Sequence, residues 1–402
     1  MENSRLASSV VILAFLLSGL AALFCAVGRG LFLEHLLVGV VALASWLWWS
    51  ATVSGRRPAS IVPYILSIVA LLVLDAVRYR AGYPAYVAAH YAELFTPRFV
   101  LSGTNWFLVA VCAPVCLLLG GGYFLSRCTT LGYFFAWWGF SYCLAEALGQ
   151  FRLELGNGAA YPHYYFLGLG AAMVLFYTAA TGLLSLLKPA GPAVAASPPT
   201  ELSSRQINLW SALFVGLVVI YGSALYREAG LLPVGVIAGS MMGGMLGWRK
   251  TTARVAADPY QVVPLYLLLQ ALFYFHVGEE ALTGFNRGIA AISGVAWSDQ
   301  DFTFFIAFLG PIIWVFGAYS LWKRQPFGNF VLWFMMVGML LGEPTHLLVF
   351  PVVRMVKEHV GYEYFSGMYT ALFPMIPAIL ALATILKNRQ PATTASHARP
   401  LR

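Results

Sequence analysis

The string FHVGEEAL places His276, Glu279 and Glu280 three and four residues apart at the end of an apolar run, VVPLYLLLQALFYF. On a helix, this spacing puts the three side chains on one face. Further along, LLGEPTHLL places Glu343 and His346 three residues apart, which again favours a shared face. Imidazole nitrogens and carboxylate oxygens are the usual protein ligands of zinc, iron and manganese.

We therefore predict a metal site with two imidazoles and two or three carboxylates. Its ligands come from the set His276, Glu279, Glu280, Glu343 and His346. A carboxylate that does not bind the metal, Glu279 or Glu280, would act as the catalytic general base on a bound water. The Glu-x-x-His pair is also one element of di-iron carboxylate sites in helix bundles. The alternative is structural, because carboxylates at helix ends often face water and buried histidines are often only hydrogen-bonded.

Two neighbouring features bear on this site. Pro344, between Glu343 and His346, is expected to bend its helix and expose backbone carbonyls. The following loop, KEHVGYEYFSG, offers His359, Tyr362, Glu363 and Tyr364 as further ligands, a proton donor or a lid.

The composition indicates a polytopic, all-α membrane protein. Of the 402 residues, 60% are hydrophobic and only 10% are charged, whereas soluble chains carry about 25% charged residues. None of the five cysteines forms a CxxC pair, so neither a disulfide framework nor a thiolate metal site is expected. The net charge is +8, and the Lys and Arg residues are spread over short loops. This distribution indicates membrane topology and not nucleic-acid binding.

Segments that lie about 200 residues apart in the sequence resemble each other. IVPYILSIVALLVLDAVRY matches VVPLYLLLQALFYFHVGEE, and RCTTLGYFFAWW matches RQPFGNFVLWF. We therefore predict two parallel six-helix repeats related by an axis along the membrane normal. The twelve expected spans are 8–27, 31–53, 60–79, 103–125, 130–150 and 164–187, then 208–226, 231–248, 260–279, 302–322, 328–348 and 365–386.

These spans define the expected domains. The first repeat covers 1–190, a cytoplasmic linker covers 191–206, the second repeat covers 207–390, and 391–402 form a disordered cytoplasmic tail. With both termini in the cytoplasm, most Lys and Arg residues fall in inner segments, as the positive-inside rule requires. The protein would then lie in a plasma or inner membrane, with the His–Glu residues in the outer half.

The first repeat has no histidine at the matching positions. Asp75 stands opposite His276, and Arg78 and Tyr79 stand opposite Glu279 and Glu280. Glu146 matches Glu343, but Gly149 stands opposite His346. We interpret this as a degenerate site that keeps a salt bridge between Arg78 and Asp75 or Glu146, while a separate ligand site remains the alternative. Glu34 and His35 fit a water-facing helix start.

The string His276-x-x-Glu279-Glu280, together with His346 in GEPTHLL, resembles the HXXEE-motif family of integral membrane proteins. The segment YFSGMYTALFPMIP is similar to that family's closing segment. The resemblance covers about 260–388, or both halves in degenerate form. Two departures are Gly342, where the family commonly has Asn, and a turn without Pro-Gly. A weaker similarity to membrane CAAX-type proteases lacks the expected arginine spacing, because Arg287 comes too late, and lacks a second histidine helix.

Three classes of function are consistent with these residues. The first is a metal-dependent membrane enzyme, either a zinc hydrolase or a di-iron-type oxidase, whose partners are membrane lipids and an amphiphilic, lipid-like substrate. The second is a pseudo-symmetric cation- or proton-coupled transporter. The third is an assembly protein whose polar residues only join helices.

Overall fold

The computed structural model describes residues 29–50, 60–90, 105–157, 165–187 and 201–388, and all regular secondary structure in these ranges is helical. Eight of the described helical segments are long and apolar enough to cross a membrane. They are Ile61–Arg80, Trp106–Ser126, Phe166–Leu187, Ser204–Ala229, Leu231–Lys250, Pro259–Thr283, Asp299–Trp322 and Pro326–Glu358. The all-α class expected from composition is therefore confirmed for the described residues, and the eight apolar segments fit a multi-pass membrane protein.

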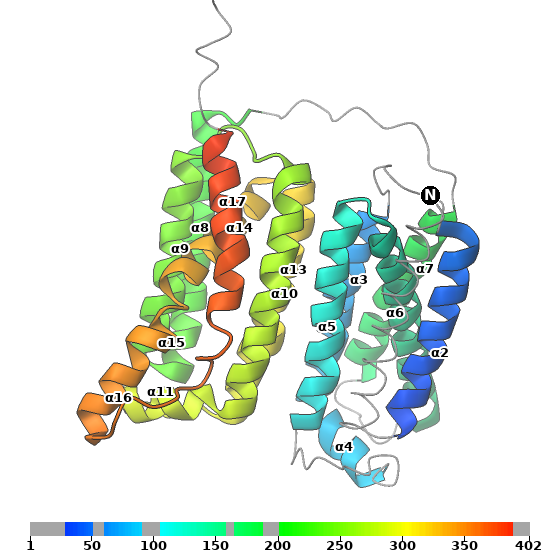
Figure 1. Ribbon diagram of the computed structural model, residues 1–402, viewed down its shortest axis with the longest axis horizontal. Coiled ribbons are helices and arrows are strands. Elements are labelled where there is room, and N and C mark those ends of the chain that lie inside the picture. Colours follow the sequence, from blue (N-terminus) through cyan, green and yellow to red (C-terminus); the bar gives the residue numbers. More distant parts are fainter. Residues whose placement is uncertain (1–28, 51–59, 91–104, 158–164, 188–200, 389–402) are drawn as a thin grey trace, which may run out of the picture.

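The helices form two groups that lie side by side (Figure 1). The first group contains α2 (Arg29–Ser45), α3 (Ile61–Arg80), α4 (Tyr83–His90), α5 (Asn105–Ser126), α6 (Thr130–Asn157) and α7 (Tyr165–Leu187). The second contains α8 (Ser204–Ala229), α9 (Leu231–Lys250), α10 (Pro259–Thr283), α11 (Phe285–Ser293), α12 (Asp299–Phe304), α13 (Gly310–Trp322), α14 (Pro326–Leu341), α15 (Thr345–Leu348), α16 (Phe350–Glu358) and α17 (Leu372–Lys387). Short π-helical turns occupy Trp46–Ser50 and Phe305–Leu309.

Corresponding helices in the two groups have corresponding neighbours. In the first group α3 packs on α7, α5 on α6, and α2 on α6. In the second group α10 packs on α17, α13 on α14, and α9 on α14. The groups meet where α5 contacts α10 and α13 contacts α3. Each of the contacts named here thus has a counterpart under the predicted repeat.

The same helix-ending turn closes α5 and α13. Cys128 and Arg324 both adopt the left-handed conformation, each with φ 56°. The amide of each donates to the carbonyl three residues back, and the next amide donates to the carbonyl five residues back, at 2.9–3.2 Å. This is the Schellman pattern. A glycine follows four residues later in both cases, Gly132 and Gly328, where a Cβ would collide with the backbone of the preceding helix.

Two predicted spans differ in detail from the helices observed. The span 328–348 is interrupted after Leu341, because Pro344 lacks an amide hydrogen for a continuous helix, and the chain restarts as α15. The span 365–386 begins as a helix only at Leu372. Residues 360–371 instead form a loop and turn in which Gly367 has φ +83°.

Two amphipathic helices lie at one end of the second group. In Figure 1, α11 crosses this end and α16 extends sideways from it, and the two pack against each other. Polar and apolar residues occupy opposite faces of such helices, which is typical of helices in a membrane interface. The first expected span, most of the linker and the tail lie outside the described residues.

Candidate metal centre

His276 and Glu280 lie one turn apart near the end of α10. This helix begins at the N-cap Asp258 and ends where Gly284 takes a left-handed conformation with φ +78°. Because α10 packs against α5, α13 and α17, both side chains are enclosed, with 0% and 5% of their surface exposed. Buried ionisable groups in membrane helices are costly, so they mark candidate functional sites.

Glu343 and His346 reach the same region from the break between α14 and α15. Glu343 lies in the turn that Pro344 enforces, and the backbone amide of His346 donates to the Glu343 carbonyl at 3.1 Å. Both side chains are buried. The break therefore directs an acid and an imidazole toward α10.

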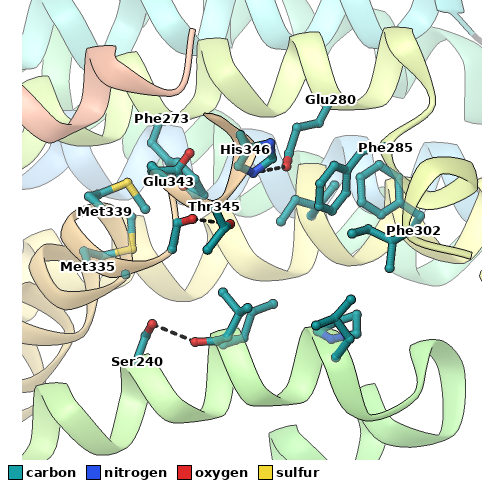
Figure 2. A pocket seen from close by; sticks show the side chains of 18 of the residues that line it. Ser240, Phe273, Glu280, Phe285, Phe302, Met335, Met339, Glu343, Thr345 and His346 are labelled. Carbon is teal, nitrogen blue, oxygen red and sulfur yellow. Dashed lines mark hydrogen bonds and ion pairs between the residues drawn. The ribbon is translucent and has the colours of Figure 1, made fainter. Parts of the chain in front are cut away.

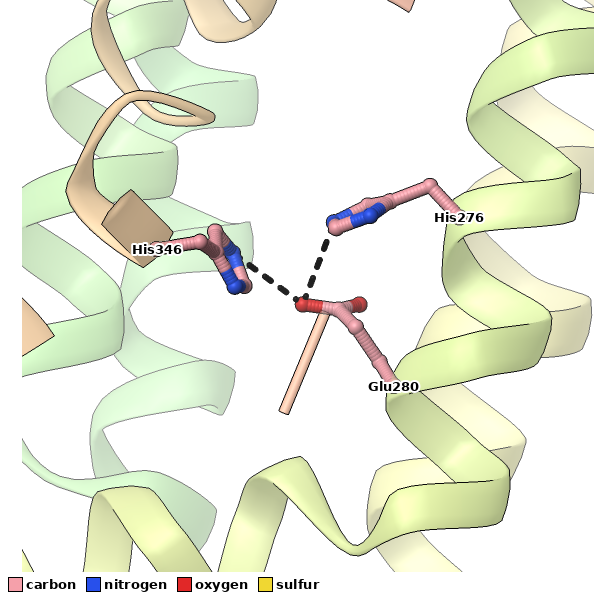
Figure 3. A group of neighbouring side chains, drawn as sticks. All are labelled: His276, Glu280 and His346. Carbon is pink, nitrogen blue, oxygen red and sulfur yellow. Dashed lines mark ion pairs between the residues drawn. The ribbon is translucent and has the colours of Figure 1, made fainter. Parts of the chain in front are cut away.

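The four side chains converge on a small volume. Glu280 Oε1 lies 3.6 Å from His276 Nε2 and 3.4 Å from His346 Nε2. Figure 3 shows the two rings on either side of this carboxylate. Potential ligand atoms of His276, Glu280 and His346 all lie within 4.8 Å of one another. Glu343 Oε2 lies 2.8 Å from His276 Nε2.

Hydrogen bonds at the far side of each ring determine the tautomers. His346 Nδ1 donates to the Ser366 carbonyl at 2.8 Å. His276 Nδ1 lies 3.0 Å from Thr370 Oγ1, whose own hydrogen goes to Glu279 Oε2 at 2.5 Å. The Thr370 oxygen must therefore accept from His276. In both neutral rings the Nε2 lone pair then faces the cluster, as it does in metal-binding histidines.

This arrangement leaves acceptors facing acceptors. Among the described side chains, His276 Nε2 and Glu343 Oε2 are buried and have no hydrogen-bond partner. A buried polar atom without a partner costs about 1–3 kcal/mol. A shared cation, either a proton or a metal ion, would relieve this cost at both atoms.

Glu279 was expected among the ligands, but it lies outside this group. Its Oε1 accepts from the Tyr364 hydroxyl at 2.6 Å and the Tyr369 amide at 3.2 Å. Its Oε2 accepts from the amide and hydroxyl of Thr370 at 2.9 and 2.5 Å. Partial burial and the bond to Glu279 raise the pKa of Tyr364, so this hydroxyl remains a donor at neutral pH. Glu279 therefore holds the loop to α10 and orients His276 through Thr370.

The other residues of the predicted loop set also lie elsewhere. Tyr362 donates to the Leu347 carbonyl at 2.6 Å, Glu363 lies 3.9 Å from Arg354, and His359 is an exposed left-handed residue at the end of α16. Of the expected ligands, proton donors and lid residues in this loop, only Tyr364 joins the hydrogen-bond network of the site.

Ser366, Gly367 and Thr370 belong to the site and were missed by the sequence reasoning. A Cβ on Gly367 would lie 2.6 Å from His346 Nδ1 and 2.8 Å from His276 Cε1, so only glycine lets the loop close over both rings. The available signal was the small, polar string FSGMYT, where a continuous apolar helix was expected.

An apolar cavity of about 110 Å³ adjoins the cluster. Glu280, Glu343 and His346 form its polar wall. Figure 2 shows aromatic and thioether side chains on other walls, among them Phe285, Phe302, Met335 and Met339. Phe285 stacks on His346 with ring centroids 5.0 Å apart. A molecule that fits this cavity would therefore be largely apolar.

The first group contains an ionic network at the matching position. Arg78 Nη1 lies 3.2 Å from Asp75 and 2.6 Å from Glu146, and Arg78 Nε donates to Gln150 at 2.9 Å. The predicted salt bridge therefore includes both acids. Gly149, which matches His346 in the sequence repeat, has open space where a Cβ would lie. The side chains of Glu34 and His35 lie outside the described part.

No family model, curated protein or solved structure matches this chain.

Proposed function

We propose that this protein is a metal-dependent, membrane-embedded enzyme in which His276, Glu280 and His346 hold one zinc or iron ion. The observations that carry the proposal are the buried His276 Nε2, which has no hydrogen-bond partner among the described side chains, and the convergence of the ligand atoms of His276, Glu280 and His346 within 4.8 Å of one another. A proton between His276 and Glu343 would satisfy that pair only. His346 Nε2 and Glu280 Oε1 would still face each other as acceptors at 3.4 Å.

The spacing and charge of the ligands support a divalent ion. With bonds of about 2.0–2.1 Å, tetrahedral coordination separates neighbouring ligand atoms by about 3.3 Å. The separations of 3.6 and 3.4 Å from Glu280 to the two rings are close to this value. Two buried carboxylates, Glu280 and Glu343, would also be neutralised by two positive charges, which matters where the dielectric constant is low.

Two histidines and one carboxylate are a ligand set of both catalytic zinc and mononuclear iron. When bound, the metal would polarise the substrate and lower the pKa of a coordinated water. Glu343 lies beside the proposed ligands and on the cavity wall, and it would serve as the general base. This role replaces the earlier assignment of Glu279 and Glu280 as catalytic bases. A single ion is preferred to a di-iron site, because the described residues bring only two histidines and two glutamates together.

The test is metal content. Protein purified in detergent is compared with His276→Ala/His346→Ala and Glu280→Gln by plasma mass spectrometry. His359→Asn is the control, because His359 is exposed and outside the cluster. We expect about one ion per chain in the parent and the control, and none in the double variant. Zinc would assign hydrolysis and iron oxidation, while equal metal content in all four proteins would refute the proposal.

We further propose that the chain is a tandem duplication with twelve spans and a degenerate first site, and that it is related to the HXXEE-motif family. The duplication is supported by the two matching Schellman turns and the matched helix neighbours. A family relation is supported by the joint burial of His276, Glu280 and His346.

We propose that both termini lie in the cytoplasm of a plasma or inner membrane and that the site lies in the outer half. Arg249 and Lys250 end α9, near the start of α10, and His276 and Glu280 lie toward the other end of α10. Basic residues on the inner side then place the cluster toward the outer side.

A cation- or proton-coupled carrier is the alternative, supported by the buried network around Arg78. Carriers built from repeats bind their substrates between the repeats, whereas the His–Glu cluster lies within the second group. Flux in proteoliposomes decides between the two functions. Loss of flux in Glu279→Gln/Glu280→Gln would favour the carrier, and unchanged flux would exclude it.

A further inference from the structure

The cavity beside the cluster is mostly apolar, with a charged wall at the cluster and the hydroxyl-bearing residues Tyr221, Ser240 and Thr345 elsewhere in its lining. Besides Glu280, Glu343 and His346, its lining includes the Ser240 hydroxyl, which donates to the Val236 carbonyl of its own helix at 2.7 Å. One further polar atom there has no partner among the described residues, the buried indole Nε1 of Trp297. A ligand would therefore be apolar over most of its length.

The size of the cavity limits how much of a ligand it holds. Its volume of about 110 Å³ is somewhat below that of the engineered apolar cavity of about 150 Å³ that accepts benzene. One unbranched chain segment fits, whereas two parallel chains do not.

A groove on the outside of the second group adjoins the cavity. It has a volume of about 860 Å³ and runs between the end of α8, the start of α9 and Val295. Leu232 and Val236 line both the groove and the cavity, so these two side chains form the partition between them. Most of α8 and α9 is not buried within the protein, so in a membrane the groove would face lipid.

Arg227 supplies the charge at the groove. It lines this groove and a second one between α8 and α9 of about 520 Å³, and its side chain is exposed. Gly230 and Val295 are neighbours, which brings Arg227 to the end of the bundle where the interfacial helix α11 lies. A guanidinium at that depth is complementary to an anionic head group.

We propose that the substrate is a single-chain amphiphile with an anionic head group, which enters laterally through this groove, between the start of α9 and residues 292–295. Arg227 binds the head group, Leu232 and Val236 gate the chain, and the chain passes the His–Glu wall into the cavity. This inference rests on the proposed function for the chemistry at that wall, but the binding mode is independent of any metal.

Cross-linking tests the proposal directly. The probe is dodecyl phosphate with a diazirine midway along its chain, added to protein in phosphatidylcholine vesicles. After irradiation, peptide mass spectrometry locates the label. We expect label on α9 and α14 residues of the cavity. Ser240→Phe and Gly338→Val, which fill the cavity, should reduce this label to background, whereas Leu246→Phe, on the exposed face of α9, should not. Both filling variants are first checked for an unchanged unfolding temperature.

The head group is tested with a matched pair of arginines. Arg227→Gln should lower labelling by the phosphate probe about tenfold, to the level of the corresponding diazirine alcohol, because a charge-assisted hydrogen bond is lost. Arg205→Gln, at the opposite end of the same helix and also exposed, should have no effect. Equal labelling by phosphate and alcohol in the parent protein would refute the anionic head group.

The outcome is separable from that of the metal proposal. His276→Ala/His346→Ala removes the metal ligands but keeps the groove, so it should still be labelled in the cavity. Cavity labelling without bound metal would refute the enzyme and retain the lipid site. The opposite result is bound metal together with label spread over all lipid-facing helices. If Ser240→Phe and Gly338→Val did not reduce that label, the lipid site alone would be refuted.

Discussion

The Thr370 hydroxyl connects His276 to Glu279 and so determines which nitrogen of His276 faces the cluster. Outer partners of this kind orient metal-binding histidines, and their loss typically costs about 10–100-fold in metal affinity. We predict that Thr370→Val weakens metal binding by about this factor. Thr370→Ser, which keeps the hydroxyl, should bind metal as tightly as the parent. Competition with a chromogenic chelator measures the affinity.

The control for this prediction is Thr384→Val on α17. The Thr384 hydroxyl is also bonded, to the Leu380 carbonyl at 2.7 Å, but it is exposed and remote from the site. Unchanged affinity in Thr370→Val would show that Thr370 does not orient the ring.

Gly367 is required at its position for two reasons, its positive φ and its contact with both imidazoles. We predict that Gly367→Ala displaces the loop, lowers the free energy of unfolding by about 1–3 kcal/mol and reduces bound metal. Thermal unfolding in detergent and metal content are the measurements. Gly361→Ala, in the same loop with open space around it, should change neither, and equal stability of the two variants would contradict the argument.

At the scale of elements, the loop between α16 and α17 functions as a cover for the site. Glu279 attaches it to α10 through Tyr364, Tyr369 and Thr370. We predict that Glu279→Gln speeds hydrogen exchange of the Tyr369 and Thr370 amides, because a neutral amide is a weaker acceptor. Glu280→Gln should instead abolish metal binding.

Glu358→Gln provides the comparison for the loop prediction. Glu358 is paired with Arg354 at 2.8 Å on the exposed face of α16, where a lost ion pair has little effect. Faster exchange at Tyr369 and Thr370 in this variant as well would mean that Glu279 is not the specific attachment.

Over the whole molecule, the first group is predicted to support the fold without contributing to the metal site. Arg78→Met would leave the buried Asp75 and the partly buried Glu146 without their cation, and removing one partner of a buried ion pair typically costs about 3–5 kcal/mol. Arg80→Met, which loses a half-exposed pair with Asp301 at 3.1 Å, should cost less than about 1 kcal/mol. We therefore expect a lower unfolding temperature only for Arg78→Met, with metal content retained in the fraction that folds. Loss of metal from protein that remains folded would place Arg78 in the function of the site.

The proposed orientation of the whole chain is tested by labelling. Lys250→Cys and Lys357→Cys lie at opposite ends of the second group, and both positions are exposed. In sealed right-side-out vesicles, an impermeant maleimide should modify Lys357→Cys and leave Lys250→Cys at the level of the parent. The reverse pattern would invert the topology.

Much of the architecture follows from local sequence. Runs of about 20 apolar residues form helices in a membrane because every backbone polar group must be satisfied within the segment. Pro344 and the capping residues Ser203 and Asp258 act on their own neighbours, so the break and the helix starts are also local features. The expected convergence of His276, Glu280, Glu343 and His346 followed from their depth along two helices.

Only the tertiary structure shows that Glu280 faces the two histidines whereas Glu279 faces the 360–371 loop. Adjacent residues on a helix point about 100° apart, and which of them faces α15 or the 360–371 loop depends on how α10 is rotated against α17. That rotation is the result of packing over the whole bundle, and no short string of sequence encodes it. The contribution of Ser366, Gly367 and Thr370 has the same origin, because the chain returns to α10 after an excursion through α14, α15 and α16. The sequence by itself determined the apolar helices and the types of side chain in the cluster, whereas long-range packing decided that Glu280 joins the cluster and that Glu279 attaches the loop.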